Sequence, residues 1–204
     1  AKRVRDDLPR ARQLMGLKPR VYVSLAPSWV TEFPDLSPAQ IISALKRLGF
    51  AGVSETALGA QIVSAHVANT LAQNPGQILI SSACPSVVSF IQKHRPKLAA
   101  HFTTLFSPLL AHCRFLRQTF GQEIGVVFIG PCIAKIAEGR DNDVAGSIDS
   151  VLTFDHLQTW LIESNALCAD VAEDNDALDT PGSSRFFPIT GGILKSFTEH
   201  DETD

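Results

Sequence analysis

The sequence lacks the features that mark several classes of protein. No apolar run approaches the roughly 18–20 residues that a membrane-spanning helix needs, and the start has no apolar stretch of the kind that a signal peptide carries. The formal net charge is -3 at pH 7. This excludes a surface that is basic throughout, which many nucleic-acid-binding proteins present. We therefore expect no membrane partner and no nucleic-acid partner.

Cysteine is also scarce. The chain has four cysteines, at positions 84, 113, 132 and 168, and no two of them form a Cys-x-x-Cys pair. Disulfide scaffolds are short chains with a high density of cysteine, so this sequence does not resemble one. We expect free or metal-bound thiols in a reducing compartment, which points to a cytoplasmic protein.

The composition is that of a folded protein, with 45% hydrophobic and 19% charged residues in a chain of 204. Residues 1–20 carry seven Lys or Arg against two Asp, a local charge of +5 that leaves -8 for the remainder. We interpret them as a basic N-terminal segment that is either a solvated helical face or a contact for an acidic partner. Residues 21–204 are interpreted as one domain. The first residue is Ala and the end is a polar tail, so we expect this domain to be an incomplete fragment.

The hydrophobic pattern predicts alternating helices and strands. Helical spacing covers residues 38–48, 59–73, 85–95, 108–120 and 154–163, and the first of these helices begins with a capping box of Ser37 and Gln40. Short, unbroken apolar runs typical of buried parallel strands cover residues 21–25, 77–80, 126–129 and 150–153, with a weaker run at 52–55. This alternation predicts an α/β fold with a mostly parallel sheet flanked by helices.

Three of the expected strands end in a turn that contains proline, at residues 26–28, 81–85 and 130–132. In parallel α/β sheets, ligands bind in the crevice outside the carboxyl ends of the strands. Two of these turns carry a cysteine, Cys84 and Cys132, so we expect their two sulfurs to face one cleft. Each is either a small buried hydrophobe or a metal ligand. Lys135 lies three residues after Cys132 and could supply positive charge to its thiolate. Cys113 and Cys168 are expected to be core residues.

The turn sequences resemble motifs of a known family. Residues 81–85 (Ser-Ser-Ala-Cys-Pro) resemble the Thr-Ser-Cys-Cys-Pro motif of the iron-only ([FeFe]) hydrogenase large subunit, and residues 131–138 resemble its Pro-Cys-x-x-Lys-x-x-Glu. Residues 26–28 match its Ala-Pro-Ser turn, and residues 148–153 and 187–192 resemble two further motifs. The five matches occur in family order over residues 20–196. The chain is therefore identified as a member of this family, with its large-subunit fold.

The resemblance implies a cofactor site. The family holds a four-iron, four-sulfur cubane on four cysteines, and one of them bridges to a di-iron subcluster that bears CO and cyanide. By motif position, Cys84 and Cys132 would be two cubane ligands, which suits the preference of iron–sulfur clusters for thiolates. Lys135 and Ser28 would donate hydrogen bonds to cyanide. Pro27 and Phe187 would line the di-iron pocket.

The departures from the family pattern are specific. The last two cluster cysteines of the family form a Cys-x-x-x-Cys motif, and this chain has none, so we expect the chain alone to lack the complete cluster. Ala83 stands where catalytic members have a proton-relay cysteine, and Val67 and Thr70 stand near the positions of the relay glutamates. Thr103 matches a relay serine. Gly130 replaces a methionine.

These departures leave three functions open. The favoured one is a hydrogenase-like protein of the sensory type, which carries out H2 and proton redox chemistry slowly because its proton relay is impaired. The second is an iron–sulfur protein of the cluster-assembly type, without the di-iron subcluster. The third is a metal-free α/β interaction domain. The resemblance implies a ferredoxin-type domain or protein as electron-transfer partner and, for a sensor, an attached signalling domain.

Overall fold

The computed structural model describes residues 4–103, 106–141 and 146–167, together with the single residues 185, 187 and 192. By its internal contacts the chain divides into two compact units. The first comprises Ala1–Thr56 and Cys113–Thr180, and the second comprises Ala57–His112 and Pro181–Asp204.

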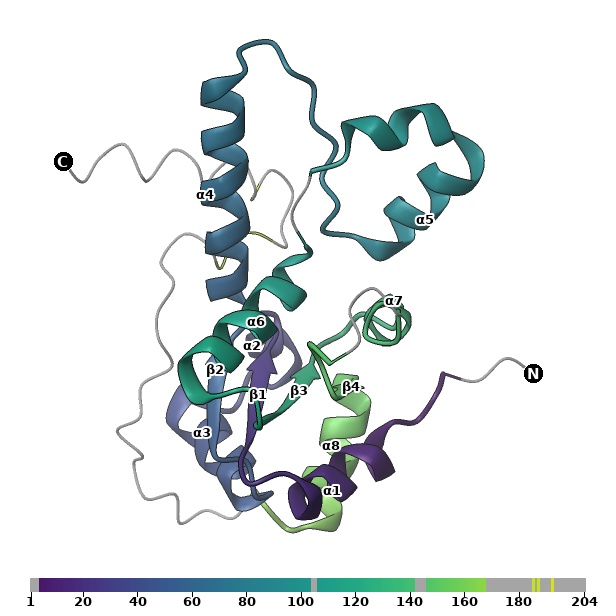
Figure 1. The fold of residues 1–204 in the computed structure, drawn as a ribbon. Coiled ribbons are helices and arrows are strands. Elements are labelled where there is room, and N and C mark those ends of the chain that lie inside the picture. The colour runs from purple at the N-terminus through teal and green to yellow at the C-terminus, as the bar shows by residue number, and fades with distance from the viewer. Residues whose placement is uncertain are drawn as a thin grey trace, which may run out of the picture. The chain divides into compact units, whose positions relative to one another are not determined.

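The first unit is built on a four-stranded sheet (Figure 1). Its strands are β1 (Val21–Leu25), β2 (Gly52–Glu55), β3 (Gly125–Ile129) and β4 (Ser150–Leu152). They lie in the order β2-β1-β3-β4, and every pair is parallel. All residues of β1 and β3 are buried, as expected when helices cover both faces of a parallel sheet. The predicted parallel α/β fold is therefore confirmed.

Helices flank this sheet, and the local sequence explains where several of them begin. They are α1 (Leu8–Leu17), α2 (Trp29–Glu32), α3 (Pro38–Arg47), α7 (Ala134–Glu138) and α8 (Phe154–Glu163). The capping box of Ser37 and Gln40 that the sequence predicts is present at the start of α3. A second capping box, formed by Thr153 and His156, begins α8. Helix α6 (Pro108–Phe120) runs from the second unit into the first.

The second unit is mainly helical in its described part. It holds α4 (Ala57–Gln73), α5 (Pro85–His94), the 3-10 helix η1 (Pro96–His101) and the start of α6. The predicted strand at residues 77–80 is wrong. Only Ile80 forms a bridge there, parallel to Phe102, and Ile78 is 71% exposed. An apolar run forms a strand only when a neighbouring strand pairs with it, and here the neighbour contributes a single residue.

Residues 1–20, predicted as a basic segment, include a packed helix. Leu8, Ala11 and Leu14 of α1 are buried, and the helix contacts β3 and β4. The apolar residues lie on one face of the helix and the charged side chains lie on the other, as in an ordinary amphipathic helix. Among the described residues, none of the helices combines the length and the apolar character needed to cross a membrane.

Candidate functional site

The predicted turns of the first unit lie together at the carboxyl edge of its sheet. The N–H of Ala26 donates to the carbonyl of Ile129 (2.8 Å), and the N–H of Gly130 donates to that of Leu152 (3.1 Å). Each turn thus extends the ladder of hydrogen bonds by one residue before the chain leaves the sheet. Pro27 and Ser28, which follow Ala26, are half-buried. This edge is where ligands bind in parallel sheets.

Cys132 lies two residues beyond Gly130, and its side chain is exposed. Its carbonyl oxygen accepts a hydrogen bond from the N–H of Lys135 (3.1 Å), which starts the turn that becomes α7. On this turn the Nζ of Lys135 lies 2.7 Å from Oε2 of Glu138, and the two side chains are only 13% and 12% exposed. The spacing Lys-x-x-Glu therefore places the two side chains on one helix face, where they form a partly buried ion pair. Glu138 matches the glutamate of the family motif, and its partner Lys135 is shown by the structure alone.

Gly130 has a steric reason to be glycine. A Cβ at this position would lie 2.6 Å from Cζ of Phe128 and 2.8 Å from Cβ of Ala26. The space that the family's methionine would need is thus occupied by neighbours from β3 and from the turn after β1. The replacement of methionine by Gly130 therefore agrees with the close packing around this position.

Glu55, at the end of β2, is a buried carboxylate at the same edge that sequence reasoning missed. It is 1% exposed, and its Oε1 accepts a hydrogen bond from Nε1 of Trp29 (3.0 Å). Next to it, the hydroxyls of Ser24 and Thr56 are 2.8 Å apart. A buried carboxylate needs such partners. The signal available in the sequence was an acidic residue directly at a strand end, followed by threonine.

Cys84 belongs to the second unit, and its side chain is exposed. It is the N-cap residue of α5, with Pro85 at the first helical position, an end of the helix that favours negative charge. Thr103 holds the preceding turn, because its Oγ1 accepts from the N–H of Ser82 (3.1 Å) and lies 2.6 Å from Oγ of Ser82. The matched hydroxyl of Thr103 is therefore engaged in shaping the segment before Cys84.

The other predicted residues are placed as follows. Ala83 is half-buried between Ser82 and Cys84, and Phe187 is a half-buried turn residue. Cys168 and residues 170–182, which include five Asp or Glu, lie outside the described residues, and so does the end of the chain after Thr190 apart from Gly192. Cys84 and Cys132 belong to different units, so the expectation that their sulfurs face one cleft stays a prediction.

The described thiols do not make up the ligand set of a cubane. A cubane needs four thiolates, and Cys113 is fully buried on α6, where burial raises the pKa of its thiol far above the usual value. Such a thiol stays protonated in the core and behaves there as a small hydrophobic residue. Cys84 and Cys132 remain, and no group of three or more His, Cys, Asp or Glu side chains in the described ranges could hold a metal ion. The donor type fits an iron–sulfur cluster, but the number of donors does not.

Comparison with known proteins identifies the family to which this fold and these motifs belong. The family model described as the iron only hydrogenase large subunit, C-terminal domain, matches residues 19–203. A relative named periplasmic [Fe] hydrogenase large subunit, from Nitratidesulfovibrio vulgaris, is 25% identical over 199 residues, covering 87% of this chain and 47% of the relative. This chain thus spans about half the length of that relative.

Solved structures with the same fold are also hydrogenases. A [FeFe]-hydrogenase studied for oxygen damage to its H cluster has a TM-score of 0.68 at 22% identity, covering 87% of this chain and 52% of its own. A variant of the [FeFe]-hydrogenase HydA1 from Chlamydomonas reinhardtii has a TM-score of 0.67 at 22% identity, covering 84% and 51%. The family model covers nearly the whole chain, the motifs occur in family order and the fold is shared. The chain therefore belongs to the family of the iron-only hydrogenase large subunit, C-terminal domain.

Proposed function

We propose that this chain is a hydrogenase-type iron–sulfur domain that supplies two thiolates, from Cys84 and Cys132, to a cluster whose other ligands come from outside the described residues. The observation that carries the proposal is the edge of the sheet in the first unit. There an exposed thiol, a partly buried lysine and the half-buried Pro27–Ser28 turn are fixed by strand ends. Each of these residues also stands at a position of a family motif.

Slow turnover is expected from the residues that stand at the family's proton-relay positions. Ala83 carries a methyl group where a relay thiol would stand, and Val67 and Thr70 on α4 have no titratable side chain. The hydroxyl of Thr70 donates to the carbonyl of His66 (2.9 Å). Proton transfer by a positioned group contributes about 10²–10⁴-fold to a rate. We therefore favour redox sensing or slow H2 chemistry over fast hydrogen production.

The test is the metal content of the full-length protein purified without oxygen. We expect bound iron and sulfide, and we expect Cys132→Ser to lose most of that iron because it removes a thiolate. Cys113→Ala is the matched control, since Cys113 is buried and should keep its iron content. Infrared bands of CO and cyanide in the intact protein would indicate the di-iron subcluster. Absence of iron from the intact protein would contradict the proposal and favour a metal-free interaction domain.

One observation favours a second candidate, an iron–sulfur protein of the assembly type. Phe128 and Ala26 fill the space beside Gly130 where catalytic members carry a methionine. Close packing beside Gly130 is compatible with cubane binding. It is less compatible with a pocket that holds two further iron atoms. Iron and sulfide without infrared bands of CO and cyanide would support this candidate.

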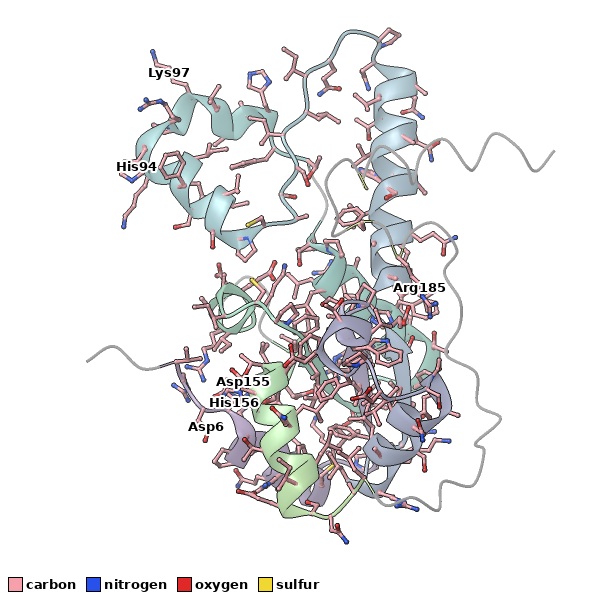
Figure 2. All side chains as sticks on the ribbon, turned by 180° about the vertical axis from the view of Figure 1, so that it is seen from behind. Asp6, His94, Lys97, Asp155, His156 and Arg185 are labelled. Atoms are coloured by element: carbon pink, nitrogen blue, oxygen red, sulfur yellow. The ribbon has the colours of Figure 1, made fainter. Side chains whose placement is uncertain are left out.

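We also propose that an electron-transfer protein of the ferredoxin type docks on the basic corner between α5 and η1. No Asp or Glu occurs from residue 56 to residue 122, and Lys93, Arg95 and Lys97 in this corner are exposed. Figure 2 shows the side chain of Lys97 pointing outward from this corner. A surface of one charge sign attracts a partner of the opposite sign and accelerates their encounter.

Salt dependence tests this docking surface. With a purified ferredoxin of acidic surface as the probe, we expect Lys97→Glu to weaken binding about tenfold at low ionic strength, a change of ~1.4 kcal/mol. Raising the salt concentration should reduce the difference between variant and original protein. Arg10→Glu reverses an exposed charge on α1 and serves as the control. Equal weakening by both variants would show that net charge alone matters and would contradict the assignment to this corner.

A further inference from the structure

The N-terminal segment, residues 4–18, lies before the part of the chain that the family model matches. It nevertheless forms hydrogen bonds with the segment that begins at Cys132 and ends at Arg140. The family match begins at residue 19, whereas Asp7 is 4% exposed. Its carboxylate accepts hydrogen bonds from Nη2 of Arg140, at 2.8 Å to Oδ1 and 3.1 Å to Oδ2. Nε of Arg5 lies 2.9 Å from Oδ1.

The backbone of Asp7 is also held. Its carbonyl oxygen accepts from the hydroxyl of Ser150 on β4 (3.4 Å) and from the N–H of Ala11 on α1 (3.0 Å). Without Arg140, the buried carboxylate would keep only Arg5 as a cationic partner, and the side chain of Arg5 is 61% exposed. Asp7 and Arg140 are therefore held together by their own electrostatics as well as by the sheet beside them.

Arg140 lies at the far end of the segment that begins at Cys132. The N–H of Arg140 donates to the carbonyl of Ala137 (3.1 Å), and the N–H of Gly139 donates to that of Lys135 (2.9 Å). Gly139 lies so close to β4 that a Cβ would be 2.9 Å from Cγ2 of Val151. Helix α7 has only five residues, too few to be stable without tertiary contacts. Its position depends on a small number of anchors, and the contact with Asp7 is one of them.

We propose that Asp7 is a positioning residue for the candidate site, acting through Arg140 on the segment from Cys132 to Glu138. Displacement of residues 5–7, by a partner or by a preceding domain, would then loosen the turn that presents Cys132 and Lys135. This inference rests on the proposed function only in taking Cys132 and Lys135 as part of a cofactor site. The physical coupling from Asp7 to α7 is independent of any cofactor.

A separate anchor holds the remainder of α1. Arg12 pairs with Glu163 of α8, and its guanidinium lies 5.6 Å from the centre of the Trp160 ring. Asp6 lies 3.7 Å from Nε2 of His156, also on α8, and Figure 2 shows these two side chains near each other. Loss of the Asp7 carboxylate should therefore loosen α7 while α1 stays attached.

Amide hydrogen exchange in the chain without metal tests this coupling. We expect Asp7→Asn to accelerate exchange at residues 134–140 at least tenfold, while the amides of α3 keep their rates. Arg140→Met should produce the same local change, and the double variant should add little to either single variant, because both remove one interaction. Arg12→Ala is the control that loosens α1 from α8 and should leave residues 134–140 unchanged.

Two outcomes would overturn the inference. The first is unchanged exchange at residues 134–140 in both Asp7→Asn and Arg140→Met. The second is an equal acceleration in α3 and α7, which would show a loss of global stability only. In full-length protein that holds iron, Asp7→Asn should also speed iron release to a chelator. If that protein holds no iron, the proposed function fails while the exchange experiment still decides the coupling.

Discussion

Replacing Arg117 with alanine is expected to lower the free energy of unfolding by about 3–5 kcal/mol, because it breaks a buried ion pair and leaves its partner uncompensated. Nη2 of Arg117 lies 2.7 Å from Oδ2 of Asp149, and the two side chains are 7% and 16% exposed. Arg117 also donates to the carbonyl oxygens of Gln122, Ile124 and Ser147. One side chain thus joins α6 to the start of β3 and to the approach to β4.

The carboxylate of Asp149 has a second role, since it accepts a hydrogen bond from the N–H of Val126 (2.8 Å). Chemical denaturation of Arg117→Ala, followed by circular dichroism, measures the expected loss. Arg12→Ala is the control, because Arg12 and Glu163 are 42% and 54% exposed and exposed ion pairs contribute at most about 1 kcal/mol. A loss for Arg117→Ala no larger than that of the control would show that the buried pair is energetically neutral.

Replacing Gly59 with alanine is expected to lower the free energy of unfolding by about 3 kcal/mol, at the upper end of the usual cost of overpacking. A Cβ at Gly59 would lie 2.0 Å from the carbonyl oxygen of Pro108 and 2.7 Å from Cβ of His112. The ring of His112 is fully buried, and burial lowers its pKa to about 3, so the ring beside Gly59 is neutral. The start of α4 and the start of α6 must separate to admit one methyl group.

The same substitution in another helix provides the control for Gly59→Ala. Gly16 lies in α1, and a Cβ there would meet nothing within 4 Å. Gly16→Ala should therefore raise stability by about 0.5–1 kcal/mol, because alanine loses less conformational entropy than glycine on folding into a helix. Thermal unfolding of the two variants should move in opposite directions. A stabilised Gly59→Ala variant would mean that α4 and α6 can separate at little cost.

Much of the fold could be predicted from local sequence. The α3 helix was predicted because its signals are local: Ser37 and Gln40 cap it, and apolar residues recur on one face. The strands at residues 21–25 and 126–129 were predicted because a short apolar run buried on both faces has few other stable conformations. Gly49 and Gly121, which end two helices, have φ values of +102° and +104°, a conformation that favours glycine.

The run at residues 77–80 was predicted wrongly for a related reason. Its composition resembles that of the other strands, but a strand also needs a partner, and pairing is a property of the whole chain. Only the single bridge between Ile80 and Phe102 forms. Apolar composition therefore indicated the segment without deciding its structure.

The sequence by itself determined the family and the parallel sheet, because motif order and hydrophobic period are written along the chain. It left open whether Cys84 and Cys132 are exposed, which the structure decided. Tertiary structure alone decided what surrounds them. It paired Lys135 with Glu138, buried Glu55 against Trp29 and joined Asp7 to Arg140. The last of these contacts links residues 133 positions apart in the chain. Burial and charge pairing depend on distances in space, and no local pattern in the sequence encodes which distant side chains will meet.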